Sequence, residues 1–241
     1  MQFYKSDLLQ YISGSISDTD LLDQLTELGL EVDQSKKEKN DLLIKLDLTP
    51  NRGDCFSLIG IARDVCAVNN LKLKLPKFKK QQQSLDSKKT ISLDKSACSS
   101  YLGQIIKLKS KGKTPQYIKK ALKAADIGQV NPIVDITNYV MLHTGQPLHA
   151  FDNKKIGKKI YVKFPSKKTR LKLLDGASHE ITKDYLTISD EKGVIALAGI
   201  MGCANSEVDE TTQEIFLESA CFDPASIRGN ARKLGFQSEA S

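Results

Sequence analysis

Two hydrophobic periods occur along this chain in an irregular order, and this mixture limits the possible folds more than any other feature. Apolar residues at every second position predict strands, for example over 42–48 and 159–164. Apolar residues three or four positions apart predict helices, for example over 58–68 and 134–142. Because no strand–helix–strand unit repeats at a fixed interval, the sequence predicts an α+β fold with mixed sheets.

A lysine-rich segment, residues 72–89, divides the chain. It holds seven Lys, a run of three Gln and little apolar material, which is typical of an exposed linker. We therefore expect a small N-terminal α/β domain over 1–71 and a larger domain over 90–241 with about eight strands and four helices. A solvated connector is the favoured role of the linker, and contact with RNA is the alternative.

Local signals predict where several elements begin and turn. Ser17 with Asp20 resembles the capping box that opens a helix. Thr114 is expected to cap a second helix, with Gly128 just beyond its end. The dipeptide at 175–176, Asp-Gly, favours a tight hairpin between two strands.

The segment 49–54, TPNRGD, predicts a tight turn. Pro50 and Gly53 favour turn backbone, and Arg52 can pair with Asp54 across it. The preferred interpretation is structural, and contact between Arg52 and RNA is the alternative.

The formal net charge is +7, and nearly all of the excess is Lys. Such a charge is compatible with a nucleic-acid partner. Surfaces that grip phosphate specifically usually include Arg as well, so compositional drift explains the charge equally well.

Several functional classes find no support in the sequence. The cysteines are odd in number, five, and form no CxxC pair, so we expect buried thiols rather than disulfides or zinc ligands. There is no phosphate-binding or dinucleotide-binding glycine motif and no nucleophile elbow. No apolar run approaches the ~18 residues of a membrane helix, and no signal peptide is recognisable, so we expect no membrane contact and a cytoplasmic location.

Five ordered segments resemble the β subunit of bacterial-type phenylalanyl-tRNA synthetase. They are LDLTPNRGDCFSLIGIARDV (46–65), VDITNYVMLHTGQPLHAFD (134–152), LLDG (173–176), LAGIMG (197–202), and FLESACFDPASIR with ARKLGFQSEAS (216–241). The resemblance covers nearly the whole chain and implies an N-terminal fragment of that subunit, with 90–241 as its editing domain.

The chain departs from the family pattern in two ways. Many bacterial members carry an oligonucleotide-binding-type domain, which contacts tRNA, before the strand that leads into TPNR. Here only residues 34–40, QSKKEKN, occupy that place, and we expect a charged turn-like junction there. The chain also stops at Ser241, inside a segment that continues in the family, which favours a trimmed form over a naturally short protein.

The resemblance implies hydrolytic editing of Tyr-tRNA(Phe). Tyrosine differs from phenylalanine by one hydroxyl, and a buried acceptor selects it because phenylalanine would leave that acceptor unpaired. Glu218 matches the family position that binds this hydroxyl, whereas a strand Glu taken alone more often faces solvent. His149 matches a position beside the aminoacyl group and is the candidate catalytic residue, with a packing role as the alternative.

Four further residues match pocket positions of the family. Thr137 and Asn138 are implied to hold the amino group or the terminal ribose, with helix capping as the alternative. Ala198 and Gly199 are implied to form a wall whose small side chains admit the ligand. No metal site is expected, and the general base stays unassigned.

The implied partners are the acceptor end of tRNA(Phe), tyrosine as the editing ligand and, in the complete enzyme, the α subunit. No cofactor is expected in this fragment; ATP and Mg²⁺ belong to the complete synthetase. This chain is expected to hydrolyse the aminoacyl ester but not to aminoacylate tRNA by itself. The alternatives are a non-catalytic tRNA-binding or structural fragment and a free-standing deacylase that edits in trans.

Overall fold

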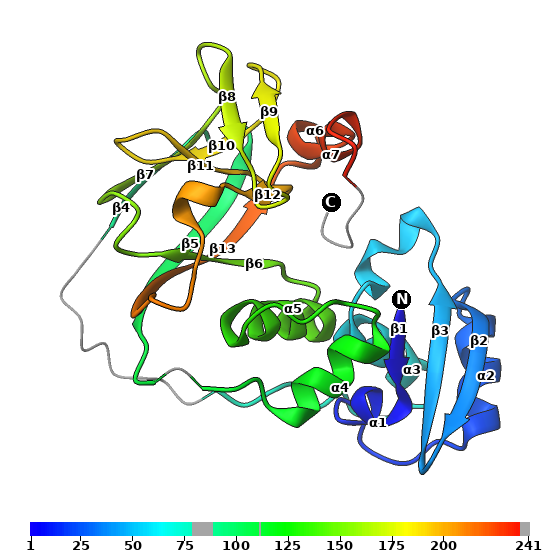
Figure 1. Ribbon diagram of the computed structural model, residues 1–241. Helices are drawn as coiled ribbons and strands as arrows, with labels where there is room; N and C mark the ends of the chain where they lie inside the picture. Colours follow the sequence, from blue (N-terminus) through cyan, green and yellow to red (C-terminus); the bar gives the residue numbers. More distant parts are fainter. Residues whose placement is uncertain (79–88, 111, 237–241) are drawn as a thin grey trace. The chain divides into compact units, whose positions relative to one another are not determined.

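The computed structural model describes residues 1–78, 89–110 and 112–236, which form two compact units (Figure 1). The first unit comprises residues 1–78 and 112–146, and the second comprises 89–110 and 147–236. Among these residues, no helix has both the length and the apolar character needed to cross a membrane.

The first unit is built on a three-stranded antiparallel sheet in the order β1-β3-β2. In the central strand, Leu42, Ile44 and Leu46 point into the core, as the alternation predicts. Helices whose apolar stripes are buried pack against these side chains. The elements are β1 (Gln2–Tyr4), α1 (Lys5–Leu9), α2 (Asp18–Glu27), β2 (Glu31–Glu38), β3 (Asp41–Asp47), the 3₁₀ segment η1 (Pro50–Cys55) and α3 (Leu58–Val68).

Two later helices, α4 (Gln116–Ala124) and α5 (Pro132–Thr144), also belong to the first unit. Lys120 of α4 reaches Asp41 of β3 at 2.7 Å and lies 4.1 Å from the ring centroid of Tyr4. The expectation of one continuous domain over 90–241 is therefore wrong. Periodicity shows which face of a helix is buried, but not which part of the chain covers it.

The expected junction over 34–40 is a β-hairpin instead. Strand β2 continues to Glu38 and pairs with β3 along its length, so only Lys39 and Asn40 form the turn. Lys39 takes the left-handed conformation at φ 54° that such a tight turn requires. Residues 34–40 are thus mostly strand, closed by a two-residue connection.

The local signals are confirmed at two of three places. The Ser17 hydroxyl accepts from the Asp20 amide at 3.0 Å, and the 175–176 turn joins β8 to β9. The Thr114 cap is wrong, because Pro115 is the N-cap residue of α4, and the Thr114 hydroxyl donates to the Asp135 carboxylate at 2.5 Å instead of accepting from an amide of α4. The predicted linker over 72–89 begins too early, because Leu73 pairs with Ile12 of the first unit. Residues 79–88 of that segment lie outside the described part of the chain.

The second unit contains ten strands, against about eight expected for 90–241. Its sheets have the orders β12-β11-β10-β7-β4, β5-β13-β6 and β8-β9, and the β4–β7 pair alone among them is parallel. The strands are β4 (Thr90–Leu93), β5 (Cys98–Lys107), β6 (Leu148–Asp152), β7 (Lys159–Lys163), β8 (Thr169–Lys172), β9 (Ser178–Ile181), β10 (Thr187–Ser189), β11 (Val194–Leu197), β12 (Met201–Gly202) and β13 (Glu214–Phe222). The mixed-sheet α+β fold is confirmed.

A hydrophobic core lies between the five-stranded and three-stranded sheets. It includes Phe151 of β6, Phe216 of β13 and Ile160 of β7, all at 1% exposure or less. A smaller core joins the β8–β9 hairpin to β11 and to the residues after α7. The remaining elements are short: η2 (Ala204–Ser206), α6 (Pro224–Ile227) and α7 (Asn230–Lys233).

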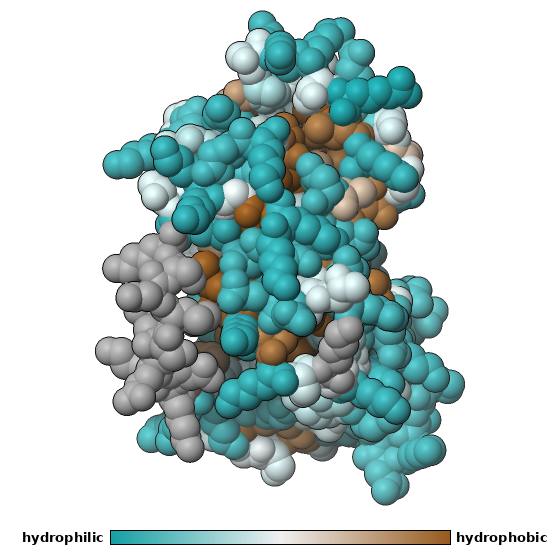
Figure 2. Space-filling model, turned by 60° about the vertical axis from the view of Figure 1, so that its left-hand side comes forward, coloured by the Kyte–Doolittle hydropathy of each residue, from teal (hydrophilic) through white to brown (hydrophobic). Residues whose placement is uncertain are grey.

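Hydrophilic residues cover most of the face shown in Figure 2, with separate hydrophobic patches between them.

Candidate functional site

A row of three residues crosses the β5–β13–β6 sheet. Glu218 of β13 lies directly opposite Gly103 of β5 on one side and His149 of β6 on the other. Directly opposed residues of antiparallel strands project from the same face of the sheet. The register therefore places the carboxyl group of Glu218 beside the imidazole of His149.

Glu218 is buried, with 5% of its surface exposed, so the solvent-facing alternative is wrong. The Tyr101 hydroxyl donates to its Oε2 at 2.9 Å. Oε1 accepts no hydrogen bond from any residue that the structure describes. Burial raises the pKa of Glu218 to about 7, and the hydrogen bond from Tyr101 opposes this rise. One carboxyl oxygen is therefore fixed while the other is available to a ligand.

A third polar side chain on this face, Tyr101, is not indicated by the sequence alone. It lies two residues before Gly103 on β5, so both project from the face that carries Glu218. Its side chain is 7% exposed, and burial together with the neighbouring carboxylate raises the pKa of its phenol well above the usual value. The residue is a buried, protonated donor at any physiological pH.

The ring of His149 is held by packing, and it forms no hydrogen bond with any residue that the structure describes. Its ring meets the Phe151 ring edge-on, with centroids 4.4 Å apart. A β-carbon on Gly202 would lie 2.7 Å from both Cε1 and Nε2 of His149, so residue 202 has to be glycine for the ring to keep this position. Burial lowers the pKa of the His149 imidazole to about 4, and the ring is neutral at pH 7.

Ala198 and Gly199 lie in the turn between β11 and β12, and both are small for packing reasons. Ala198 is fully buried in the core that also contains Tyr101. Gly199 has φ +66°, and a β-carbon there would lie 3.1 Å from Ile227 of α6. The same turn places Gly202 against the ring of His149, so this segment forms one side of the row of Gly103, Glu218 and His149.

Thr137 and Asn138 lie on α5 of the first unit, whereas the other four candidates lie in the second. The Thr137 hydroxyl donates to the carbonyl of Val134 at 2.8 Å. The helix-cap alternative is wrong, because Asn131 caps α5 by accepting from the Ile133 and Val134 amides at 3.0 Å. A ligand-binding role for Thr137 and Asn138 stays a prediction.

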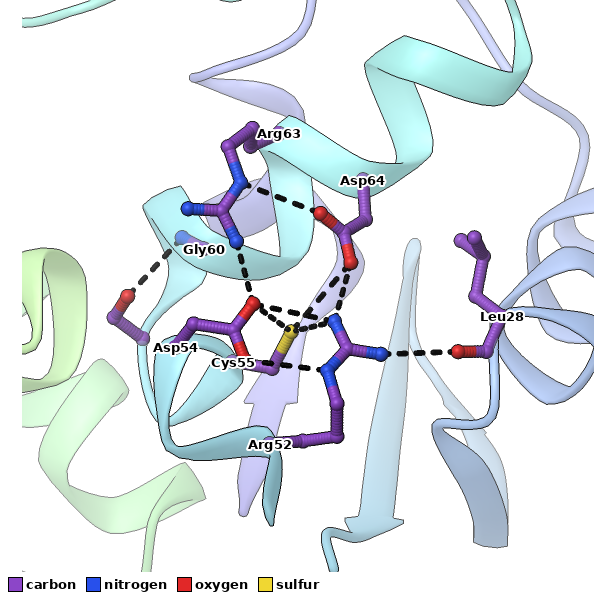
Figure 3. A network of polar contacts seen from close by, with 8 residues as sticks. Leu28, Arg52, Asp54, Cys55, Gly60, Arg63 and Asp64 are labelled. Atoms are coloured by element: carbon purple, nitrogen blue, oxygen red, sulfur yellow. Dashed lines mark hydrogen bonds and ion pairs between the residues drawn. The ribbon is translucent and has the colours of Figure 1, made fainter.

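The TPNRGD segment forms a polar network in the first unit (Figure 3). Arg52 bonds to both oxygens of Asp54, at 3.2 and 3.3 Å, to the Leu28 carbonyl at 3.1 Å, and to Asp64. Arg63 also reaches Asp54, at 2.5 Å. The predicted Arg52–Asp54 pair is confirmed, and the network ties η1 to α3 and to the end of α2.

The ligand atoms of Asp54, Cys55 and Asp64 lie within 4.8 Å of one another, a spacing that suits a cation. Two guanidinium groups already neutralise these carboxylates, which argues against a metal there. Burial also raises the pKa of the Cys55 thiol to about 11, so it is not a thiolate. Four of the five cysteines are buried free thiols, as expected.

Comparison with known proteins gives a consistent picture. The family model for the B3/4 domain matches residues 97–241. The phenylalanine–tRNA ligase β subunit of Rhodopirellula baltica is 38% identical over 238 residues, covering 97% of this chain and 35% of that protein. The corresponding subunit of Photorhabdus laumondii is 42% identical over 216 residues, covering 89% and 27%. The chain thus spans about a third or less of the length of these relatives.

Among solved structures, an N-terminal fragment of the phenylalanyl-tRNA synthetase β subunit from Pyrococcus horikoshii covers 94% of this chain. The chain covers 69% of that fragment, with 19% identity and a TM-score of 0.49. The assignment of this chain to a family rests on the relatives found by sequence, which are 38% and 42% identical to it, and not on this structure.

Proposed function

The chain belongs to the B3/4 domain family, and from that premise we propose that it removes tyrosine from mischarged Tyr-tRNA(Phe) as the β-subunit portion of a phenylalanine–tRNA ligase. The single observation that carries this proposal is the buried Glu218, whose Oε1 is available beside His149. The coarser part, membership of the family, rests on the match over residues 97–241. The substrate and the reaction are the proposed part.

The Tyr101–Glu218 hydrogen bond supports tyrosine as the ligand. At 2.9 Å, it already demonstrates the interaction between a phenol and this carboxyl group that a bound tyrosine would repeat at Oε1. Phenylalanine would bury Oε1 without a partner, at a cost of about 1–3 kcal/mol. That cost gives roughly a 5- to 150-fold preference for tyrosine from one contact.

The protonation state of Glu218 adds a pH dependence to this selection. A phenol that donates a hydrogen bond favours the ionised carboxylate, and with its pKa near 7 the group is about half ionised at neutral pH. Tyrosine binding should therefore tighten as the pH rises through 7. A neutral Glu218 would still accept a hydrogen bond, but a weaker one.

The proposed reaction is direct hydrolysis of the ester by water. Water oxygen bonds to the ester carbonyl carbon, the bond to the ribose oxygen breaks, and that oxygen takes up a proton, which releases tyrosine and free tRNA. Burial raises the pKa of the nearby Cys203 thiol to about 12, which argues against a covalent thioester route. The neutral imidazole of His149 can accept a hydrogen bond from the attacking water, and positioning of this water is the role proposed for it.

The test compares release of tyrosine from Tyr-tRNA(Phe) with release of phenylalanine from Phe-tRNA(Phe). We expect the chain to deacylate the first substrate preferentially, and Glu218→Gln to remove most of that preference. Glu210→Gln, which changes an exposed loop carboxylate, is the matched control and should behave like the parent. Equal hydrolysis of both esters by the parent chain would contradict the proposal.

One observation favours a second candidate. Because the chain covers only 35% or less of its relatives, it could bind tRNA and tyrosine without completing the hydrolytic site. Retained tyrosine binding without release of either amino acid would select this binding role. Either role implies tRNA(Phe) as a partner and, in a complete synthetase, the α subunit.

A further inference from the structure

Positive charge is concentrated in the second unit. The described residues of the first unit carry 14 Lys and Arg against 14 Asp and Glu, whereas those of the second carry 18 against 13. Two segments account for most of this excess: residues 165–185, around the β8–β9 hairpin, and 223–236, which include α6 and α7. Together they hold eight Lys and Arg against four Asp and Glu.

The arginines divide in the same way. Arg52 and Arg63 are engaged by the carboxylates of the first unit. The other three, Arg170, Arg228 and Arg232, are exposed and form no ion pair within the described part of the chain. Glu180 lies opposite Arg170 across the hairpin, but its carboxylate is paired with Lys168 at 2.9 Å. Arginine is the side chain best suited to bind phosphate, because its planar fork can contact two oxygens at once.

Both arginine-bearing elements touch the turn of the candidate site (Figure 1). At the end of the β8–β9 hairpin, the Leu174 amide donates to the Gly202 carbonyl at 3.1 Å. On the other side, Ile227 of α6 packs against Gly199. The turn that shapes the site thus has one arginine-bearing element at each end.

The position of Arg170 along the hairpin fits a contact outside the site. Arg170 and Lys172 alternate with Leu171 and the buried Leu173, so the charged side chains point away from the small core. At about 3.3 Å per strand residue, Arg170 lies about 13 Å along the chain from Leu174. This distance corresponds to a few nucleotides of extended RNA rather than to the aminoacyl group itself.

We infer that the β8–β9 hairpin and the α6–α7 segment bind the phosphates of an RNA strand whose aminoacylated 3′ end enters the site. Arg170 supplies one contact, and Arg228 and Arg232 supply the other. The choice of RNA as the ligand rests on the proposed function, whereas the charge and its position do not. Recognition of this kind is independent of base sequence and strongly dependent on salt.

The test measures binding of uncharged tRNA(Phe) by fluorescence anisotropy between 50 and 300 mM KCl. The triple variant Arg170→Gln, Arg228→Gln, Arg232→Gln should bind about 10-fold or more weakly at low salt, with a salt slope smaller by about 2 to 3. A control variant, changed to Gln at Lys95, Lys107 and Lys158, loses the same charge elsewhere on the second unit.

A second measurement separates this inference from the proposed function. Hydrolysis of 2′(3′)-O-tyrosyladenosine, which has no phosphate, should be equal in the parent and the triple arginine variant. If neither hydrolyses it but the arginine effect on binding remains, the editing function fails and the RNA surface stands. Parent-like RNA binding by the arginine variant, equal loss in the lysine control, or no RNA binding by the parent would each overturn the inference.

Discussion

Tyr101→Phe removes one hydroxyl from the centre of the candidate site and isolates its contribution. The deleted group donates to Glu218 at 2.9 Å, and both side chains are buried, at 7% and 5% exposure. Loss of a buried hydrogen bond that leaves its acceptor unpaired costs about 1–3 kcal/mol. The variant should therefore unfold at a lower urea concentration than the parent, with a free energy of unfolding reduced by about that amount.

The cost should depend on pH. The hydrogen bond from Tyr101 lowers the pKa of Glu218, so it stabilises the ionised form more than the neutral form. Without it, the pKa of Glu218 rises further above about 7, and the folded variant keeps a proton that the unfolded chain has lost. The variant then loses stability relative to the parent as the pH rises through and above 7. The difference should be larger at pH 8.5 than at pH 5.5.

Urea unfolding followed by circular dichroism at these two pH values measures both effects. Tyr185→Phe is the matched control, because Tyr185 is also 7% exposed and its hydroxyl has no partner among the described residues. The same deletion there should cost little and show no pH dependence near 7. A Tyr101→Phe variant as stable as the parent, or one with an equal loss at both pH values, would refute the reasoning.

Three further predictions concern other positions in the two units. Burial lowers the pKa of His143 to about 4, so the unfolded chain binds an extra proton between about pH 4 and 6.5, and stability falls as the pH drops through that window. His143→Gln should remove about 2 kcal/mol of this dependence, measured by urea unfolding at pH 4.5 and 7. Gly202→Ala forces a β-carbon against His149 and should cost about 1–3 kcal/mol together with most of the deacylation rate, whereas Gly128→Ala, in open space, should cost neither. Arg52→Lys cannot keep the contacts to two carboxylates and a carbonyl, and should lower the midpoint of thermal unfolding. An unchanged midpoint would show that the Arg52 network does not stabilise the fold.

The local structure of this protein follows from its sequence to a large extent. The two-residue period of 42–48 predicts β3 because the sheet buries one of its faces, and Leu42, Ile44 and Leu46 occupy that face. Ser17 is recognisable as a cap because capping depends on residues only three positions apart. Elements that depend on such short-range contacts can be predicted from the sequence without knowledge of the fold.

Contacts between residues far apart in the chain cannot be predicted from the local sequence in this way. The contact between Tyr101 and Glu218 joins residues 117 positions apart, and it depends on the register of β5 against β13. The family resemblance pointed to Glu218 and His149, but not to the phenol that holds the carboxyl group or to the glycine that makes room for the imidazole. These neighbours follow only from the sheet, because opposed strands bring together residues that share no local pattern.

The division of the first unit into residues 1–78 and 112–146 has a consequence for biosynthesis. A ribosome releases the chain from its N-terminus, so the first sheet emerges long before α4 and α5, which complete its packing. Strands β4 and β5 are made in between. Strand β5 can pair with β13 only when β13, more than a hundred residues later, has also been made. The first unit can therefore reach its native state only after residue 146 has been made, and the second only after β13 has been made. A cut in the gene near codon 90 would yield two incomplete pieces rather than two domains.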